Sequence, residues 1–410
     1  MTDVPARIVT APAVVRDRAT WLAYFHIGLF GYFLYAFGPS IALLRDERGY
    51  TRTVASLHGS AMALGAVVVG FLAVHVVRRT GRGPFLRMGS VTLAAGLLLY
   101  TGFSSLWVTL LGAFVASGGG TMIMVGVNAF LPDHHGPAGP RAMSEAHGLG
   151  ATMGLLGPLA VGLGVAIGWG WRVGLLATIV GLVVLEIARG RNTEQFDGPH
   201  GHPDDEPGHA PHGPLPRRFW LAMAVFGVCA GTEFCLTLWG SDLLRDRAGL
   251  GASAAAASLV TLVGGMAVGR VAGAPLVSRF DPDLVLAATM GLTVVGFTIA
   301  WLSAAPGPML VGFAVIGLGL GLQSPLAIGR AVIAAEGQAD RGAGLTSVAA
   351  GLASGIAPFV LAAVADHLGV HTAFLIVPAL MVAGILLVRA APVPVTDAVG
   401  DAVPTDAVPD

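Results

Sequence analysis

The sequence predicts an all-α membrane protein in which twelve transmembrane helices form two bundles of six. Hydrophobic residues make up 54% of the chain and charged residues only 11%, whereas a soluble protein carries about 25% charged residues. Uncharged apolar runs long enough to cross a bilayer follow one another along the chain. Short patterns also recur at a nearly constant spacing, which indicates a duplicated unit.

The apolar runs predict the helices in order. They lie at 21–44, 53–77, 88–132, 146–171 and 173–185, and then at 219–242, 248–278, 284–329, 342–365 and 367–388. The third run of each half is too long for one span, and breaks at 103–107 and 303–308 divide it into two helices. The hydrophobicity is continuous rather than alternating, which excludes a β-barrel.

The domain organisation follows from this layout. We predict a tail, a six-helix bundle, a linker, a second bundle and an acidic tail, at 1–20, 21–189, 190–216, 217–389 and 390–410. An even number of helices places both termini on one side, where most of the arginines also fall. The positive-inside rule therefore predicts cytoplasmic termini in a multi-pass protein of the inner (plasma) membrane.

The clearest repeat is "LLRDERGY" at 43–50, which returns as "LLRDRAGL" at 243–250. Each copy is expected to end the first helix of a half and to open the following loop. Gly49 and Gly249 would permit the reversal of the chain there. Both halves start on the same side of the membrane, so they are predicted to be parallel repeats.

Composition excludes several classes of function. All 23 basic residues are arginine, so lysine chemistry is absent, and the net charge of −1 gives no electrostatic case for nucleic acid. Cys229 and Cys235 lie in one apolar run and predict no disulfide framework. No hydrolase, metalloprotease or nucleotide-binding motif is present, so we expect neither an enzyme nor a cofactor.

The linker contains "GPHGHPDDEPGHAPHGPLP" at 198–216. Two interpretations stay open for it. Its Pro, Gly and charged residues are typical of a solvated, disordered loop, whereas its histidines are typical of a segment that senses a metal. We assign no metal site to the chain.

Over about 21–389 the sequence resembles the major facilitator superfamily. The six-plus-six layout with a mid-chain linker is similar to that family, and "VRRTGRG" at 77–83 resembles its loop signature G-x-L-x-D-R-x-G-R-R. Arg79, Gly81 and Arg82 match the signature. The resemblance implies a transporter that works by alternating access, with a central cavity between the bundles.

The resemblance also implies gate residues near the cytoplasmic ends of the helices. Arg79, Gly81 and Arg82 belong to this set. Arg78 stands where the signature has its acid, and the second copy keeps Arg279 with Ser278 in the acidic position. Asn128 and Arg330 lie near the same ends and complete the predicted gate, with ordinary helix packing as the alternative.

Glu233 is the strongest candidate for chemistry. It lies eight residues before the end of its apolar run at Ser241, which is roughly 12 Å at 1.5 Å per residue. Ionisable groups inside the hydrocarbon are costly and usually functional. We therefore predict that Glu233 couples transport to proton movement, and a structural hydrogen bond to a neighbouring helix is the alternative.

Four further residues are predicted to bind substrate. Arg270 can reach an anionic substrate, pair with Glu233 or extend to the membrane surface. Gln323 lies in mid-helix, where its amide can orient a substrate or bond across helices. Tyr32 and Tyr35 lie on the aromatic first helix, whose glycines suit a cavity wall.

The leading functional prediction is a secondary active transporter of a small solute, proton-coupled through Glu233. Export of drugs and uptake of an organic solute both stay open. The expected partners are a small-molecule substrate, a proton and the lipid bilayer, with no nucleic acid, and the protein is expected to be a monomer. A transporter-like receptor or sensor that binds ligand without flux is the alternative.

Overall fold

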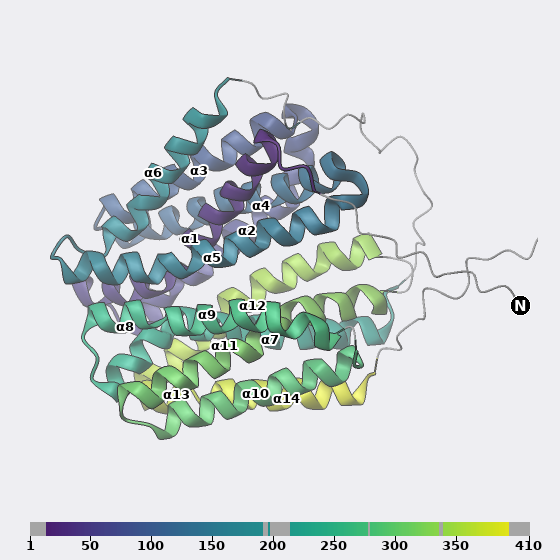
Figure 1. The fold of residues 1–410 in the computed structure, drawn as a ribbon. Helices are drawn as coiled ribbons and strands as arrows, with labels where there is room; N and C mark the ends of the chain where they lie inside the picture. The colour runs from purple at the N-terminus through teal and green to yellow at the C-terminus, as the bar shows by residue number, and fades with distance from the viewer. Residues whose placement is uncertain (1–13, 192–195, 197–213, 278, 336–338, 393–410) are drawn as a thin grey trace, which may run out of the picture.

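The computed structural model describes residues 14–191, 196, 214–277, 279–335 and 339–392, which are almost entirely helical (Figure 1). The first half contains α1 Arg18–Arg48, α2 Arg52–Thr80, α3 Arg82–Gly102, α4 Leu106–His135, the 3-10 turn η1 Gly136–Ala138, α5 Gly139–Ala166 and α6 Arg172–Arg189. The second half contains α7 Arg217–Ala248, α8 Ala252–Ser258, α9 Val260–Val277, α10 Pro282–Leu302, α11 Pro306–Ala334, α12 Ala339–Leu368, α13 Val370–Ala373 and α14 Ile376–Ala390.

The described helices confirm the predicted all-α membrane fold. Eleven segments in the described part of the chain are long and apolar enough to cross a membrane. Two of them combine short helices: α8 with α9, and α13 with α14. The twelfth predicted helix corresponds to α6, which has 18 residues and carries the charged residues Arg172, Glu186 and Arg189.

Several helices extend past their apolar runs, because backbone hydrogen bonding continues where the side chains become polar. One expectation is wrong for this reason: the two LLRD motifs lie inside α1 and α7 rather than at the start of loops. The expected reversal of the chain at Gly49 and Gly249 is confirmed. Gly49 and Gly249 follow these helices in the left-handed region, with φ of 67° and 63°.

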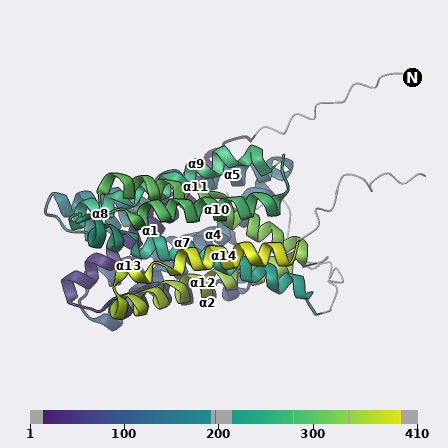
Figure 2. The same cartoon turned by 90° about the horizontal axis from the view of Figure 1, so that it is seen from below.

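The helices of the two halves form two neighbouring groups, α1–α6 and α7–α14 (Figure 1). We call the end at which α1 begins and α14 ends the terminal end, and the opposite end the distal end. The view from below shows the long helices running between these two ends (Figure 2). The linker prediction for 190–216 falls largely outside the described residues.

The two halves contact each other toward the distal end. α1 packs on α7, α2 on α12, and α5 on α8 and α9. A Cβ atom added to Gly38 of α1 would collide with the carbonyl oxygen of Thr237 in α7, so the two backbones touch. Ser60 donates a hydrogen bond of 2.9 Å across the halves to the carbonyl of Gly355. The halves are therefore closely joined where these helices approach the distal end.

Candidate functional site

The predicted coupling residue Glu233 lies in the middle of α7 and is hydrogen-bonded from both halves. The Tyr35 hydroxyl of α1 donates to one carboxylate oxygen at 3.4 Å, and the Ser324 hydroxyl of α11 donates to the other at 3.2 Å. The carboxylate is thus held between the first helix of one half and two helices of the other.

Arg270 of α9 faces the same space. Its Nε donates to the carbonyl of Gly321 at 3.2 Å, and its charge interacts electrostatically with Glu233 and Tyr35. It also interacts with His147 of α5. Arg270 therefore lies near Glu233, and its binding of an anionic substrate stays a prediction.

His147 extends this group to α4, because its Nε2 lies 3.3 Å from Oδ1 of Asn128. We call the set of side chains the central polar cluster: Tyr35, Asn128, His147, Glu233, Arg270 and Ser324. All six are only partly buried although they lie within membrane-length helices. The cluster therefore brings an acid, a cation and several hydrogen-bonding groups together in one place, as a binding site for a polar solute requires.

Two predicted substrate-binding residues lie elsewhere. The Tyr32 hydroxyl donates to the carbonyl of Gly174 at 2.7 Å, which joins α1 to α6. The Gln323 amide donates to the Thr293 hydroxyl at 2.9 Å, which joins α11 to α10. Both side chains are buried within one half. The structure therefore gives each a packing contact and does not bring it to the central polar cluster.

The predicted gate residues lie mostly at the terminal end. Arg82 at the start of α3 forms an ion pair of 2.5 Å with Asp133 at the end of α4. Gly81 links α2 to α3 with φ 81°, and Arg79 and Arg279 are exposed. Asn128 contacts His147 instead.

Arg330 makes the corresponding terminal-end contact in the second half. It forms an ion pair with Asp283 of α10 and donates to the carbonyls of Val388 and Ala391. Like the Arg82 pair, this contact joins helices of a single half. Neither pair connects the two halves, so a gate function for these residues stays a prediction.

Several ion pairs between described residues cross from one half to the other at the distal end. Asp242 of α7 accepts from Arg45 of α1 and, at 2.8 Å, from Arg52 of α2. Arg245 of α7 pairs with Asp46 of α1. We call these contacts the distal ion-pair network, together with Asp366 of α12, which accepts from the backbone and hydroxyl of Thr53.

The repeated LLRD motifs contain Arg45, Asp46 and Arg245 of this network. Arg45 contacts the adjacent Asp46 at 2.7 Å, and Arg245 pairs with the same Asp46 across the halves. The network also uses Asp242, whose place 200 residues earlier is taken by Ala42, so no repeat could indicate it.

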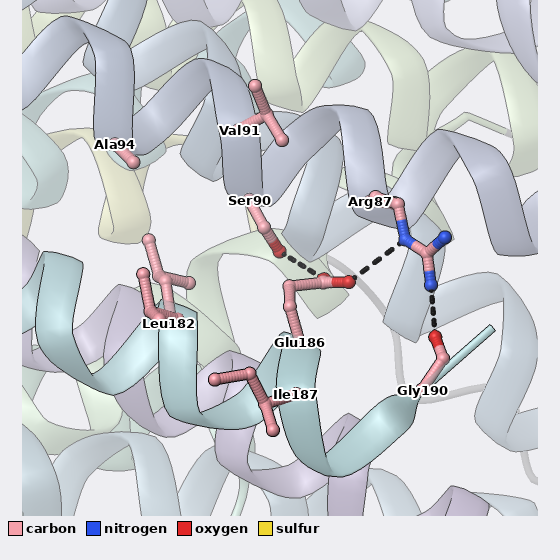
Figure 3. A pocket seen from close by; sticks show the side chains of 9 residues that line it. Arg87, Ser90, Val91, Ala94, Leu182, Glu186, Ile187 and Gly190 are labelled. Atoms are coloured by element: carbon pink, nitrogen blue, oxygen red, sulfur yellow. Dashed lines mark hydrogen bonds and ion pairs between the residues drawn. The ribbon is translucent and has the colours of Figure 1, made fainter.

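A second acidic site lies between α3 and α6 at the terminal end, beside a pocket of about 370 Å³ (Figure 3). Glu186 accepts from Ser90 at 2.9 Å and Arg87 at 3.1 Å, and lies 3.4 Å from the buried Arg189. The Nε2 of the fully buried His26 is 3.5 Å away. Sequence reasoning missed this site because the apolar run ends one residue before Glu186.

We expect Glu186→Ala to destabilise the protein by about 3 kcal/mol, because it leaves Arg189 buried without its acid. Thermal or denaturant unfolding in detergent measures this loss. Asp133→Asn is the matched control at the same end. It breaks the partly exposed Arg82 pair and should cost less than about 1 kcal/mol. Equal effects of the two variants would contradict a structural role for Glu186.

Two multi-helix halves around a shared polar cluster define the architecture of a membrane transporter. The sequence matches the Major Facilitator Superfamily over residues 20–327, and the chain belongs to that family. This confirms the resemblance found from the motifs, and it confirms a transporter rather than an enzyme. No curated protein matches the sequence closely.

Solved structures show the same fold. A bacterial homolog of the human lysosomal transporter Spinster, in an inward-facing and unoccupied conformation, aligns with TM-score 0.74 at 12% identity, covering 92% of this chain and 96% of its own. The nucleoside transporter NupG aligns with TM-score 0.67 at 12% identity, covering 91% and 98%. The E. coli fucose:proton symporter aligns with TM-score 0.61 at 16% identity, also covering 91% and 98%.

Proposed function

We propose that this protein is a proton-coupled secondary transporter in which Glu233 binds the coupling proton. The observation that carries the proposal is the hydrogen bond from Tyr35 of the first half to Glu233 of the second half. When an acid is hydrogen-bonded from both halves, a change in its protonation alters hydrogen bonds to both of them. Glu233 is also the group through which proton binding would change the charge of the central polar cluster.

We further propose that the substrate is a small organic anion. With Glu233 ionised, its charge offsets that of the nearby Arg270. Protonation removes this offset and leaves Arg270 as a cation beside the hydroxyls of Tyr35 and Ser324. A carboxylate-sized anion fits such a set, since arginine binds carboxylates through charge-assisted hydrogen bonds.

The conformation supports alternating access as the mechanism. The distal ion-pair network joins the halves at the distal end. At the terminal end, two ion pairs of the described residues, Arg82–Asp133 and Arg330–Asp283, each lie within one half. We propose that the terminal end faces the cytoplasm of a bacterium, as the arginine distribution predicts. The structure would then correspond to a state open to the cytoplasm.

Flux measurements test the proposed function. Full-length protein in liposomes with an imposed pH gradient is screened against panels of carboxylates, sugars, amino acids and drugs, with a pH-sensitive dye inside. We expect a carboxylate to move protons in a protein-dependent manner. Thermal-shift binding of a solute without any flux would favour the receptor, and flux of a solute without proton movement would contradict coupling.

A further inference from the structure

A second groove at the terminal end lies on the other side of α6, between α1 and α6. Its volume is about 530 Å³. Leu22, Phe25 and Leu29 line it from α1, Val184 and Leu185 from α6, and Met153 from α5. Val184 and Phe25 are 60% and 43% exposed. In a membrane-spanning bundle this apolar surface faces lipid rather than water.

One cation stands at the mouth of the groove. Arg18, the first residue of α1, is exposed and donates to the carbonyl of Ala188 in α6. Among the described residues, no carboxylate forms an ion pair with it. The adjacent Asp17 is engaged by His134 at 2.7 Å and caps the backbone of Thr20. Within the described part of the chain, the charge of Arg18 therefore has no acidic partner at the membrane surface.

The length of the groove matches one leaflet. From Arg18 to Leu29 the helix rises roughly 16 Å at 1.5 Å per residue. Half of a hydrocarbon core of about 30 Å is nearly the same length. The indole of Trp21, 45% exposed, lies beside the mouth, at the depth where tryptophans meet headgroups.

Gly181 of α6 lines the groove, and a Cβ atom added to it would lie 2.5 Å from Cδ2 of Leu29. The residue 200 positions later is Met381 of α14, whose side chain is fully buried. The pocket on the α3 side of α6 is lined by the Glu186 carboxylate and by Arg87, which pair at 3.1 Å (Figure 3). Of these two pockets, the one on the α1 side is lined by an arginine without a carboxylate beside it.

We propose that this groove binds one anionic phospholipid from the leaflet at the terminal end. An acyl chain would lie along Phe25, Leu29 and Val184, and the headgroup phosphate would contact Arg18. Such a site follows the general pattern in which basic pockets between membrane helices hold anionic headgroups. Trp21 would fix the depth of the headgroup.

Native mass spectrometry of the delipidated full-length protein tests the site, with phosphatidylglycerol and phosphatidylcholine as probes. We expect the first phosphatidylglycerol to bind about fivefold more tightly than phosphatidylcholine, the effect of one arginine near the membrane surface. Arg18→Gln should remove this preference. Arg217→Gln is the matched control, because Arg217 is exposed at the start of α7, and it should keep the preference.

A variant that fills the groove tests the contact with the acyl chain separately from the contact between Arg18 and the headgroup. Gly181→Met introduces the residue of the second half, and we expect it to weaken both lipids. A Cβ atom there meets only the flexible end of Leu29. Val184→Phe is the alternative variant if the first does not fold. Equal binding of the two lipids, a preference that survives Arg18→Gln, or displacement of phosphatidylglycerol by inorganic phosphate alone would overturn the proposal.

Discussion

Replacing Asp242 with asparagine is expected to open the distal end of the protein. Asp242 is 3% exposed and holds Arg45 and Arg52 of the other half. Removing one partner from a buried ion pair costs about 3 kcal/mol when the other charge is left unpaired. Arg45 and Arg52 still face Asp46 and Asp366, so we expect about half of that cost, which alters the ratio of closed to open states roughly tenfold.

Spin-label distances measure this shift. Ser104 and Ala304 are exposed in equivalent distal loops of the two halves, and cysteines there can be labelled after Cys229 and Cys235 are replaced by alanine. We expect the distribution to move to longer distances in Asp242→Asn.

The matched control for this experiment is Glu47→Gln. Glu47 pairs with Arg172 at 2.7 Å at the same end but within the first half. Its replacement should leave the Ser104–Ala304 distances unchanged. Unaltered distances in Asp242→Asn would show that the distal ion-pair network does not hold the halves together.

Glu233→Gln is expected to abolish substrate-driven proton movement while leaving substrate exchange in place. Glutamine keeps the size and the hydrogen-bonding capacity of the side chain, but it cannot bind and release a proton. The dye signal in proteoliposomes under a pH gradient should fall to that of protein-free liposomes. Exchange of labelled for unlabelled substrate, measured without a gradient, should continue.

Ser324→Ala separates proton binding from packing. It removes one of the two hydrogen bonds to Glu233 but leaves the carboxyl group. Such a bond contributes about 1 kcal/mol, so transport should change by at most about fivefold.

Proton coupling that persists in Glu233→Gln would remove Glu233 from the mechanism and leave Glu233 a structural role.

Helix content and fold family could be predicted from the sequence because each membrane helix makes its backbone hydrogen bonds within itself. Each helix therefore corresponds to one local run of apolar residues. The match of Arg79, Gly81 and Arg82 to a loop signature identified the family. Glu233 and Arg270 could be selected as a pair of candidates because few charged residues interrupt the runs. Their position beside each other then follows from helix packing.

Long-range contacts could not be predicted in the same way. Tyr32 and Tyr35 are only three residues apart, yet one joins α6 and the other reaches Glu233. Their directions depend on which helices surround α1. Gln323 and Ser324 are neighbours in α11, and only the serine faces the central polar cluster. A single sequence does not show which of two adjacent polar residues faces the other half.

The placement of the cross-half ion pairs at one end has a consequence for inhibitors. In the proposed state, open at the terminal end, a compound supplied from the terminal side meets the central polar cluster. A compound confined to the distal side binds only the fraction of molecules in which the distal ion-pair network is broken, and its apparent affinity falls by that fraction. Two molecules with equal intrinsic affinity would therefore differ in potency according to the side from which each one arrives.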